Sequence, residues 1–339
     1  MSEIPVAHQH KVLSATEAVR HVRSGQKVFL GTAPATPRTL VAALEALPKP
    51  PQDVELIHFL VQGAVPIDAE GRVLTRYRHR CFFAGMEMRP ALEQGVAEYL
   101  PVSLARVPEL FRIGRIPLDV AFVQVTPPDV YGYVSLGLAV DIVAAAVRHA
   151  KLVIAEVNPA MPWTMGDSTV HLRDIHHLVH VEPVLGGYVH PPVAEEVVER
   201  VARYIAGTID DGSTLQIGLG RIPNHGLKYL VDRKDLGIHS DVITDAILPL
   251  LERGVITGRQ KSREVGKIVA SFATGTRRPY DAIDRNSLFN FQPIDAICDA
   301  AVLASQHKFV SVMQAFALDL TGDVVADQFN GRLYGGVVA

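Results

Sequence analysis

The fold is decided by two stretches of the chain, Leu215-Gln216-Ile217-Gly218-Leu219-Gly220-Arg221-Ile222-Pro223 and Leu236-Gly237-Ile238-His239-Ser240-Asp241. The first has the pattern of a short strand followed by a glycine turn. Pro223 is then expected to open a helix, because a proline has no N–H to leave unpaired at that position. The helix should run from Asn224 to Val231, and Leu236 to Ser240 should form the next strand. Together they predict a βαβ unit with parallel strands and a right-handed crossover.

Asp241 is the candidate for chemistry in this unit. Ligands of open parallel sheets bind outside the carboxyl ends of the strands, and Asp241 closes its strand at that edge. We expect its carboxylate to face the glycine loop, whose backbone N–H groups suit an anion or a developing oxyanion. A second interpretation makes Asp241 the N-cap of a helix that begins near Thr244. Spacing alone leaves both interpretations open.

The composition of the chain excludes several classes of protein. Its 339 residues suggest two domains, and 48% hydrophobic with 20% charged residues are not the composition of a disordered chain. A net charge of -3 argues against a nucleic-acid partner, which would require a basic face. Cys81 and Cys298 lie far apart and indicate neither a metal site nor a disulfide framework.

The sequence indicates neither a membrane segment nor a secretory signal. Met1 to Lys11 has no apolar core. The most apolar predicted helix, Leu138 to Val147, is interrupted by Asp141 and is too short to cross a bilayer. We therefore expect a cytoplasmic protein without a membrane partner.

Strand and helix patterns alternate along the chain, which predicts an α/β fold with a mainly parallel sheet. Asp119 to Val125 and Leu152 to Val157 have the apolar runs of strands that are buried on both faces. A strand, a glycine–proline loop and a helix occur around Gly31 to Pro37 and again around Gly218 to Pro223, so we expect two related α/β halves. Glycine and proline pairs between Gly186 and Pro192 indicate a boundary, which divides the chain into residues 1–188 and 189–339.

Three other kinds of site have weaker support. Gly218, Gly220 and Asp241 imitate a dinucleotide-binding fingerprint, but Pro223 replaces the third glycine, so no nicotinamide cofactor is expected. A cluster of four histidines lacks an acidic ligand at suitable spacing, so no metal is expected. Its members are His171, His176, His177 and His180. The chain also has no Gly-x-Ser-x-Gly motif of a serine hydrolase.

Five segments in the same order resemble the acetyl-CoA hydrolase/transferase family, which includes acetate and 4-hydroxybutyrate CoA-transferases. The segments are Gly31 to Leu44, Asp119 to Pro162, Leu215 to Leu227, Leu236 to Asp245 and Asp319 to Gly322. The resemblance implies two CoA-transferase-like α/β domains of the NagB/RpiA type with the active site between them. It also implies coenzyme A as part of the substrate and a ping-pong mechanism through covalent acyl-enzyme and CoA-enzyme intermediates.

The chain departs from the family pattern at two places. Family members have Gly-Ile-His-Ser-Glu-Met with a nucleophilic glutamate, whereas this chain has Asp241 and then Val242. Family members also continue beyond Ala339, and Gly335-Gly336 resembles the start of one of their glycine loops. We expect Phe309 to Leu318 to form a long strand of an incomplete second domain. A homodimer or a complementing second chain is the expected assembly.

The resemblance assigns roles to individual residues. Asp241 is the expected catalytic group, supported by His239 and Ser240. The residues expected to bind coenzyme A are Gly218, Leu219, Gly220, Ile222, Pro223, Asn224, Gly31, Gly335 and Gly336. These roles predict transfer or hydrolysis of a short acyl-CoA thioester, with a small carboxylate as the other substrate. A non-catalytic CoA-binding or partner-binding module, or half of a two-chain enzyme, is the alternative.

Overall fold

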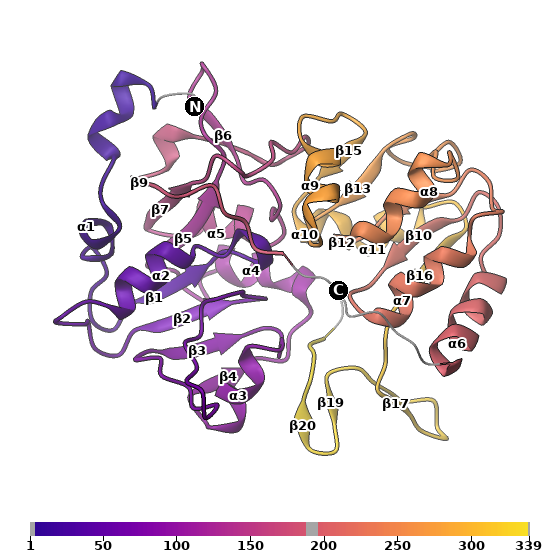
Figure 1. The fold of residues 1–339 in the computed structure, drawn as a ribbon, viewed down its shortest axis with the longest axis horizontal. Coiled ribbons are helices and arrows are strands. Elements are labelled where there is room, and N and C mark those ends of the chain that lie inside the picture. Colours follow the sequence, from indigo (N-terminus) through magenta and orange to yellow (C-terminus); the bar gives the residue numbers. More distant parts are fainter. Residues whose placement is uncertain (1–3, 188–195, 338–339) are drawn as a thin grey trace. The chain divides into compact units, whose positions relative to one another are not determined.

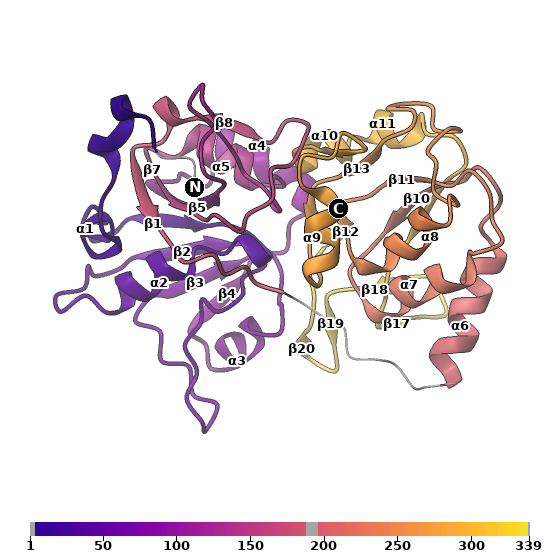
Figure 2. The same cartoon turned by 45° about the horizontal axis from the view of Figure 1, so that its top comes forward.

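The computed structural model describes residues 4–187 and 196–337. These residues form two compact units (Figures 1 and 2). The first comprises residues 4–163, 168–186 and 315–337, and the second comprises residues 164–167, 187 and 196–314. The boundary predicted between residues 188 and 189 lies outside the described residues. No helix in the described ranges is long and apolar enough to cross a membrane.

The first unit is built on a seven-stranded parallel sheet with the order β4-β3-β2-β1-β5-β7-β9. Its strands are β1 (Lys27–Leu30), β2 (Glu55–His58), β3 (Arg78–Cys81), β4 (Ala97–Tyr99), β5 (Val120–Val125), β7 (Leu152–Val157) and β9 (His177–His180). A separate antiparallel pair joins β6 (Tyr133–Ser135) to β8 (Thr169–His171). All six residues of β5 are buried, which confirms the strand predicted from its apolar run.

Helices flank this sheet. The helices are α1 (Ala15–Val19), α2 (Arg38–Glu45), α3 (Met88–Glu93), α4 (Val107–Arg112) and α5 (Val143–His149). The chain passes from β1 through α2 to β2 on one side, and from β5 through α5 to β7 on the other side. Because both crossovers are right-handed, α2 and α5 lie on opposite faces of the sheet. α1 packs on α2, and α4 packs on α5.

The second unit repeats this arrangement in a five-stranded parallel sheet with the order β15-β13-β11-β10-β16. Its strands are β10 (Thr214–Ile217), β11 (Gly237–His239), β13 (Ile268–Ala270), β15 (Phe289–Phe291) and β16 (Phe309–Val312), with the short pair β12 (Val242–Ile243) and β14 (Phe272–Ala273). In both sheets the second, third and fourth strands lie on one side of the first strand, and the fifth lies on its other side. This shared order supports the two related halves predicted from the loops.

The helices of the second unit are α6 (Glu196–Gly207), α7 (Arg221–Gly226), α8 (Leu248–Glu252), α9 (Arg277–Ile283), α10 (Ile294–Ile297) and α11 (Ala300–Ala304). β10 and β11 are parallel neighbours, which confirms the predicted βαβ unit. The prediction that Pro223 opens the helix is wrong, because α7 begins at Arg221 and Pro223 is its third residue. Since the first-turn N–H groups have no partner within a helix, the proline is still tolerated there.

The prediction of one long strand from Phe309 to Leu318 is also wrong. β16 ends at Val312, and the next two residues pack against the glycine loop. A Cβ atom on Gly218 would lie 2.5 Å from the sulfur of Met313, and one on Gly220 would lie 2.4 Å from Oε1 of Gln314. The chain therefore leaves the sheet at this point because it must turn over the loop.

The C-terminal residues form two hairpins in the first unit. β17 (Ala317–Leu318) pairs with β18 (Val324–Val325), and β19 (Gln328–Phe329) pairs with β20 (Arg332–Leu333). Gly322, in the turn between β17 and β18, has a φ of 96°. Gly335 also lies in this unit, where its carbonyl accepts a hydrogen bond from the Ala84 N–H at 2.7 Å. These residues therefore do not continue the second sheet.

Candidate active site

Asp241 lies between β11 and β12, at the carboxyl end of β11. The preceding residue ties this position to the neighbouring strand. The Ser240 hydroxyl donates to the carbonyl of Ile217 at 3.1 Å and accepts from the Ile217 N–H at 3.0 Å. Because Ile217 directly precedes Gly218, this pair of hydrogen bonds holds Asp241 close to the start of the glycine loop, as predicted.

The main chain of Asp241 is fixed from the other side of the sheet edge. Its carbonyl accepts hydrogen bonds from the N–H groups of Ser271 and Phe272, both at 3.0 Å. The alternative role of Asp241 as a helix N-cap is wrong. The cap of the turn at Asp245–Ile247 is Thr244, whose hydroxyl accepts from the N–H of Ala246 at 3.3 Å.

The carboxylate of Asp241 has few strong partners. Burial of the group raises its pKa to about 6, while the nearby main-chain N–H groups of Asp241 and Val242 and the nearby side chains of Ser240 and Gln216 oppose the rise. The Ser240 hydroxyl is 3.4 Å from Oδ1, a long hydrogen bond. A carboxylate with a raised pKa is ionised at neutral pH and is a better base and nucleophile than an ordinary aspartate.

The glycine loop is held open by Asn224. Its amide nitrogen donates to the carbonyl of Gly220 at 2.7 Å and of Gly218 at 3.4 Å, and its amide oxygen accepts from the Thr244 hydroxyl. Gly220 has a φ of 149°, a conformation that an L residue adopts only with strain. Leu219 and Ile222 are half-buried, so both keep surface that a ligand can contact.

The His239 ring contacts the end of α10 and Gln306. Its Nε2 lies 2.9 Å from the carbonyl of Ile297, and its Nδ1 lies 3.2 Å from the amide nitrogen of Gln306. The ring is 1% exposed, and burial lowers its pKa. His239 is therefore neutral, and it supports the strand that carries Asp241.

The three remaining glycines belong to the first unit. Gly31 follows β1, and a Cβ atom there would lie 3.0 Å from the carbonyl oxygen of Ala35. A Cβ atom on Gly336 would lie 2.7 Å from the carbonyl oxygen of Phe82. The structure thus groups Gly31, Gly335 and Gly336 in one unit and Asp241 with the loop from Gly218 to Asn224 in the other.

Comparison with known proteins identifies the family. Residues 5–205 match the acetyl-CoA hydrolase/transferase N-terminal domain, and residues 275–338 match the C-terminal domain. The chain belongs to the acetyl-CoA hydrolase/transferase family. It is 35% identical to a 4-hydroxybutyrate coenzyme A transferase of Clostridium kluyveri, over 97% of this chain and 76% of the relative. It is 33% identical to a succinyl-CoA:acetate/propanoyl-CoA:succinate CoA transferase of Fasciola hepatica, over 94% of this chain and 67% of the relative.

Two solved structures have the same fold as this chain. RipA from Yersinia pestis superposes with a TM-score of 0.86 at 27% identity, over 96% of this chain and 78% of RipA. A 4-hydroxybutyrate CoA-transferase from Porphyromonas gingivalis superposes with a TM-score of 0.80 at 29% identity, over 99% of this chain and 82% of the other. The α/β fold with its two parallel sheets is therefore the fold of an enzyme of this family.

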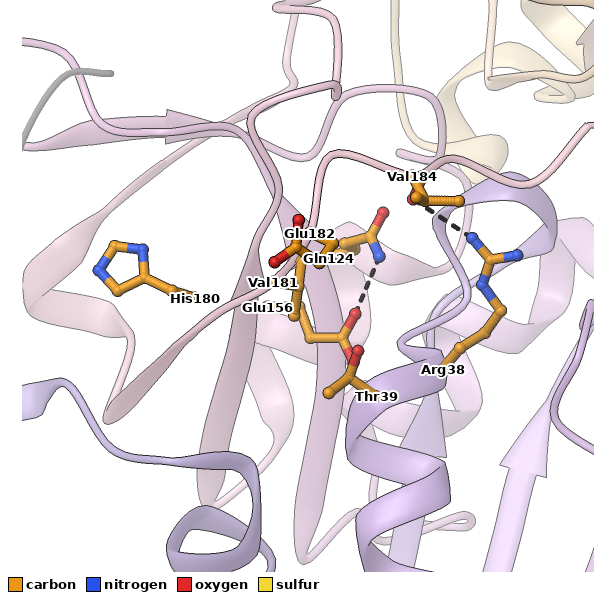
Figure 3. Close-up of a pocket in the computed structure, with 8 residues that line it drawn as sticks. All are labelled: Arg38, Thr39, Gln124, Glu156, His180, Val181, Glu182 and Val184. Atoms are coloured by element: carbon orange, nitrogen blue, oxygen red, sulfur yellow. Dashed lines mark hydrogen bonds between the residues drawn. The ribbon is translucent and has the colours of Figure 1, made fainter.

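A cavity of about 410 Å³ in the first unit was not predicted (Figure 3). It lies at the carboxyl ends of β5, β7 and β9, beside the first residues of α2. One of its lining residues, Glu156, is buried: its Oε1 accepts from the Leu40 N–H at 2.8 Å and its Oε2 accepts from the Gln124 amide at 2.9 Å. Burial raises the pKa of Glu156 to about 7. A glutamate inside an apolar strand was the sequence signal that could have located it.

The histidine cluster has no metal-binding geometry in the part of the chain that the structure describes. His171 ends β8, while His177 and His180 begin and end β9, so these three histidines lie on strands. Among residues 4–187 and 196–337, no group of three or more metal-ligating side chains converges.

Proposed function

We propose that this chain is a CoA-transferase that also hydrolyses its substrates, with Asp241 attacking short acyl-CoA thioesters. The position of Asp241 carries the proposal, because it is a carboxylate with a raised pKa at the end of a strand beside a glycine loop. Family membership and the names of the relatives, which describe CoA transfer between short carboxylates, support the substrate class. Coenzyme A would bind along the loop formed by Gly218, Leu219, Gly220, Ile222, Pro223 and Asn224.

The transfer reaction proceeds in balanced covalent steps. A carboxylate oxygen of Asp241 attacks the thioester carbonyl, the C–S bond breaks, and CoA thiolate leaves behind a mixed anhydride. The thiolate then attacks the aspartyl carbonyl of the anhydride, which releases the carboxylate product and forms an aspartyl–CoA thioester. An acceptor carboxylate reverses both steps and leaves as the new acyl-CoA. Such covalent intermediates divide one difficult exchange into easier ones.

Aspartate in the place of the family glutamate changes the balance between transfer and hydrolysis. The carboxylate is shorter by one methylene, which withdraws it by about 1.5 Å. A misplacement of about 1 Å can reduce a rate on the order of a hundredfold. The withdrawn group leaves space for a water molecule, for which Asp241 can act as general base. We therefore propose that the rate of hydrolysis, relative to the rate of transfer, is higher in this chain than in a family member with glutamate.

Thiol release from acetyl-CoA and butyryl-CoA, with and without a carboxylate acceptor, tests the proposal. Release without an acceptor, lost in Asp241→Ala, identifies hydrolysis through Asp241. A new acyl-CoA formed only with the acceptor identifies transfer through the same residue. Asp241→Glu should restore transfer relative to hydrolysis. Asp232→Ala, at an exposed position of the same unit, is the matched control.

Two outcomes would reject the proposal. Full activity of Asp241→Ala would show that another group attacks the thioester. Calorimetric binding of CoA without turnover in either assay would indicate a non-catalytic CoA-binding module, or a half-enzyme that needs a second chain. Analytical ultracentrifugation of the same sample would report whether a homodimer is present.

A further inference from the structure

Gln216 places a buried amide beside Asp241. It is the third residue of β10 and is 2% exposed. Its Oε1 accepts a hydrogen bond from the Ser311 hydroxyl of β16 at 3.0 Å. Its Nε2 is buried and has no hydrogen-bond partner among the described residues. The amide lies close enough to Asp241 to help lower the pKa of the carboxyl group.

A buried N–H donor without a partner is costly. Leaving such a group unsatisfied costs about 1–3 kcal/mol, so the position of Gln216 requires an explanation. The opposite orientation of the amide would pair Nε2 with the Ser311 hydroxyl, but it would turn Oε1 toward the Asp241 carboxylate. Two acceptors facing each other repel, so the Asp241 side of the amide is the donor side. The donor is therefore directed toward the reacting group.

We propose that Gln216 is the positioning residue of this site, and that its Nε2 donates to the oxygen of Asp241 that does not attack the thioester. This inference rests on the proposed function of Asp241. Held in this way, the carboxylate presents its other oxygen to the substrate. In the mixed anhydride the same donor faces the aspartyl carbonyl oxygen.

The donor has its largest effect on the second covalent step. When CoA thiolate attacks the aspartyl carbonyl of the anhydride, negative charge develops on that carbonyl oxygen. The S–C bond then forms, the bond to the acyl carboxylate breaks, and the carbonyl is restored as an aspartyl–CoA thioester. A donor already in place stabilises the developing oxyanion without reorganisation. Gln216 therefore directs the thiolate to the enzyme's carbonyl and favours transfer over hydrolysis.

Gln216→Met tests this role, because it keeps the length of the side chain and removes the donor. Loss of one oxyanion donor reduces kcat on the order of 10²–10³-fold. We expect a loss of that size in kcat for transfer with little change in KM. The yield of the aspartyl–CoA adduct, measured by mass spectrometry of the peptide that contains Asp241, should fall in parallel. The acidic limb of the kcat/KM profile should move to higher pH, because the amide no longer helps to lower the pKa of Asp241.

Ser311→Ala is the second variant. It keeps the amide of Gln216 and frees its oxygen, so the amide can rotate, and we expect a smaller change in the same direction in all three measurements. This variant also tests the role if Gln216→Met does not fold. The role of Gln216 would be overturned, with Asp241 still the nucleophile, if a folded Gln216→Met protein kept the kcat, the adduct yield and the acidic limb of the wild type. Activity that survives in Asp241→Ala would instead overturn the proposed function.

Discussion

The buried Glu156 should make the stability of the first unit depend on pH. Burial raises its pKa from 4.5 to about 7, so between these values the folded state binds a proton that the unfolded state has released. The stabilisation is fully present below pH 4.5 and is lost as the pH rises through 7. At about 1.4 kcal/mol per pKa unit, the whole effect is about 3 kcal/mol, of which about 2 kcal/mol is lost between pH 5.5 and pH 8.

Glu156→Gln removes this dependence, because a neutral amide keeps an acceptor for the Leu40 N–H without a charge to bury. The single tryptophan, Trp163, belongs to the first unit and reports its unfolding in urea by fluorescence. We expect the free energy of unfolding of the variant, minus that of the wild type, to increase by about 2 kcal/mol from pH 5.5 to pH 8. Glu182→Gln, at the exposed rim of the same cavity, controls for a general change of charge.

Parallel stability curves for the wild type and Glu156→Gln would refute this reasoning. They would mean that Glu156 ionises as readily in the folded protein as in the unfolded chain. In that case its two hydrogen bonds, from the Leu40 N–H and the Gln124 amide, would compensate the burial completely. If the free energy of unfolding of Glu156→Gln, minus that of the wild type, increased toward acidic pH, the sign would be opposite to that expected for a carboxyl group with a raised pKa.

Two further substitutions test the second unit. Gly220→Ala forces an L residue to a φ of 149° and moves Gln314. It should lower the free energy of unfolding by about 1–3 kcal/mol and kcat/KM at least tenfold. The control Gly254→Ala, at a φ of 70° with no atom near the added Cβ, should lower the free energy of unfolding without changing kcat/KM. Equal kcat/KM in both variants would contradict a role for the Gly220 conformation. His239→Ala removes the hydrogen bond to the Ile297 carbonyl and should therefore lower the melting temperature. The activity that remains should keep the wild-type pH profile, because His239 is neutral. A shifted acidic limb would show that His239 takes part in proton transfer.

The strands were predictable because burial leaves a local signal. β7 has the predicted bounds, since a parallel strand covered on both faces requires a continuous apolar run. The end of β16 was not predictable, because what stops it is the packing of Met313 and Gln314 on a loop about a hundred residues earlier in the chain.

The candidate site was only partly predictable for the same reason. The glycine loop and Asp241 could be identified from their residue types and their positions at the ends of predicted strands. The roles of Gln216 and Glu156 depend on partners that are 95 and 116 residues away, Ser311 and Leu40. Each is a polar residue within an apolar strand, which indicates a buried hydrogen bond but not its partner.

Comparison of Glu156 and Asp241 shows why one carboxylate is structural and the other is a candidate nucleophile. Both lie at the carboxyl end of a strand, and burial raises the pKa of both. Glu156 uses each oxygen as the acceptor of a hydrogen bond shorter than 3 Å, so its lone pairs are committed to the helix start and to a neighbouring strand. The Asp241 carboxyl accepts a long hydrogen bond of 3.4 Å from Ser240, lies near the main-chain N–H groups of Asp241 and Val242, and lies beside a Gln216 amide nitrogen that has no hydrogen-bond partner among the described residues. A carboxylate with a raised pKa that is held by long hydrogen bonds can still attack a carbonyl. The length of the hydrogen bonds to its oxygens, and not the pKa alone, therefore separates a candidate reactive group from a structural one.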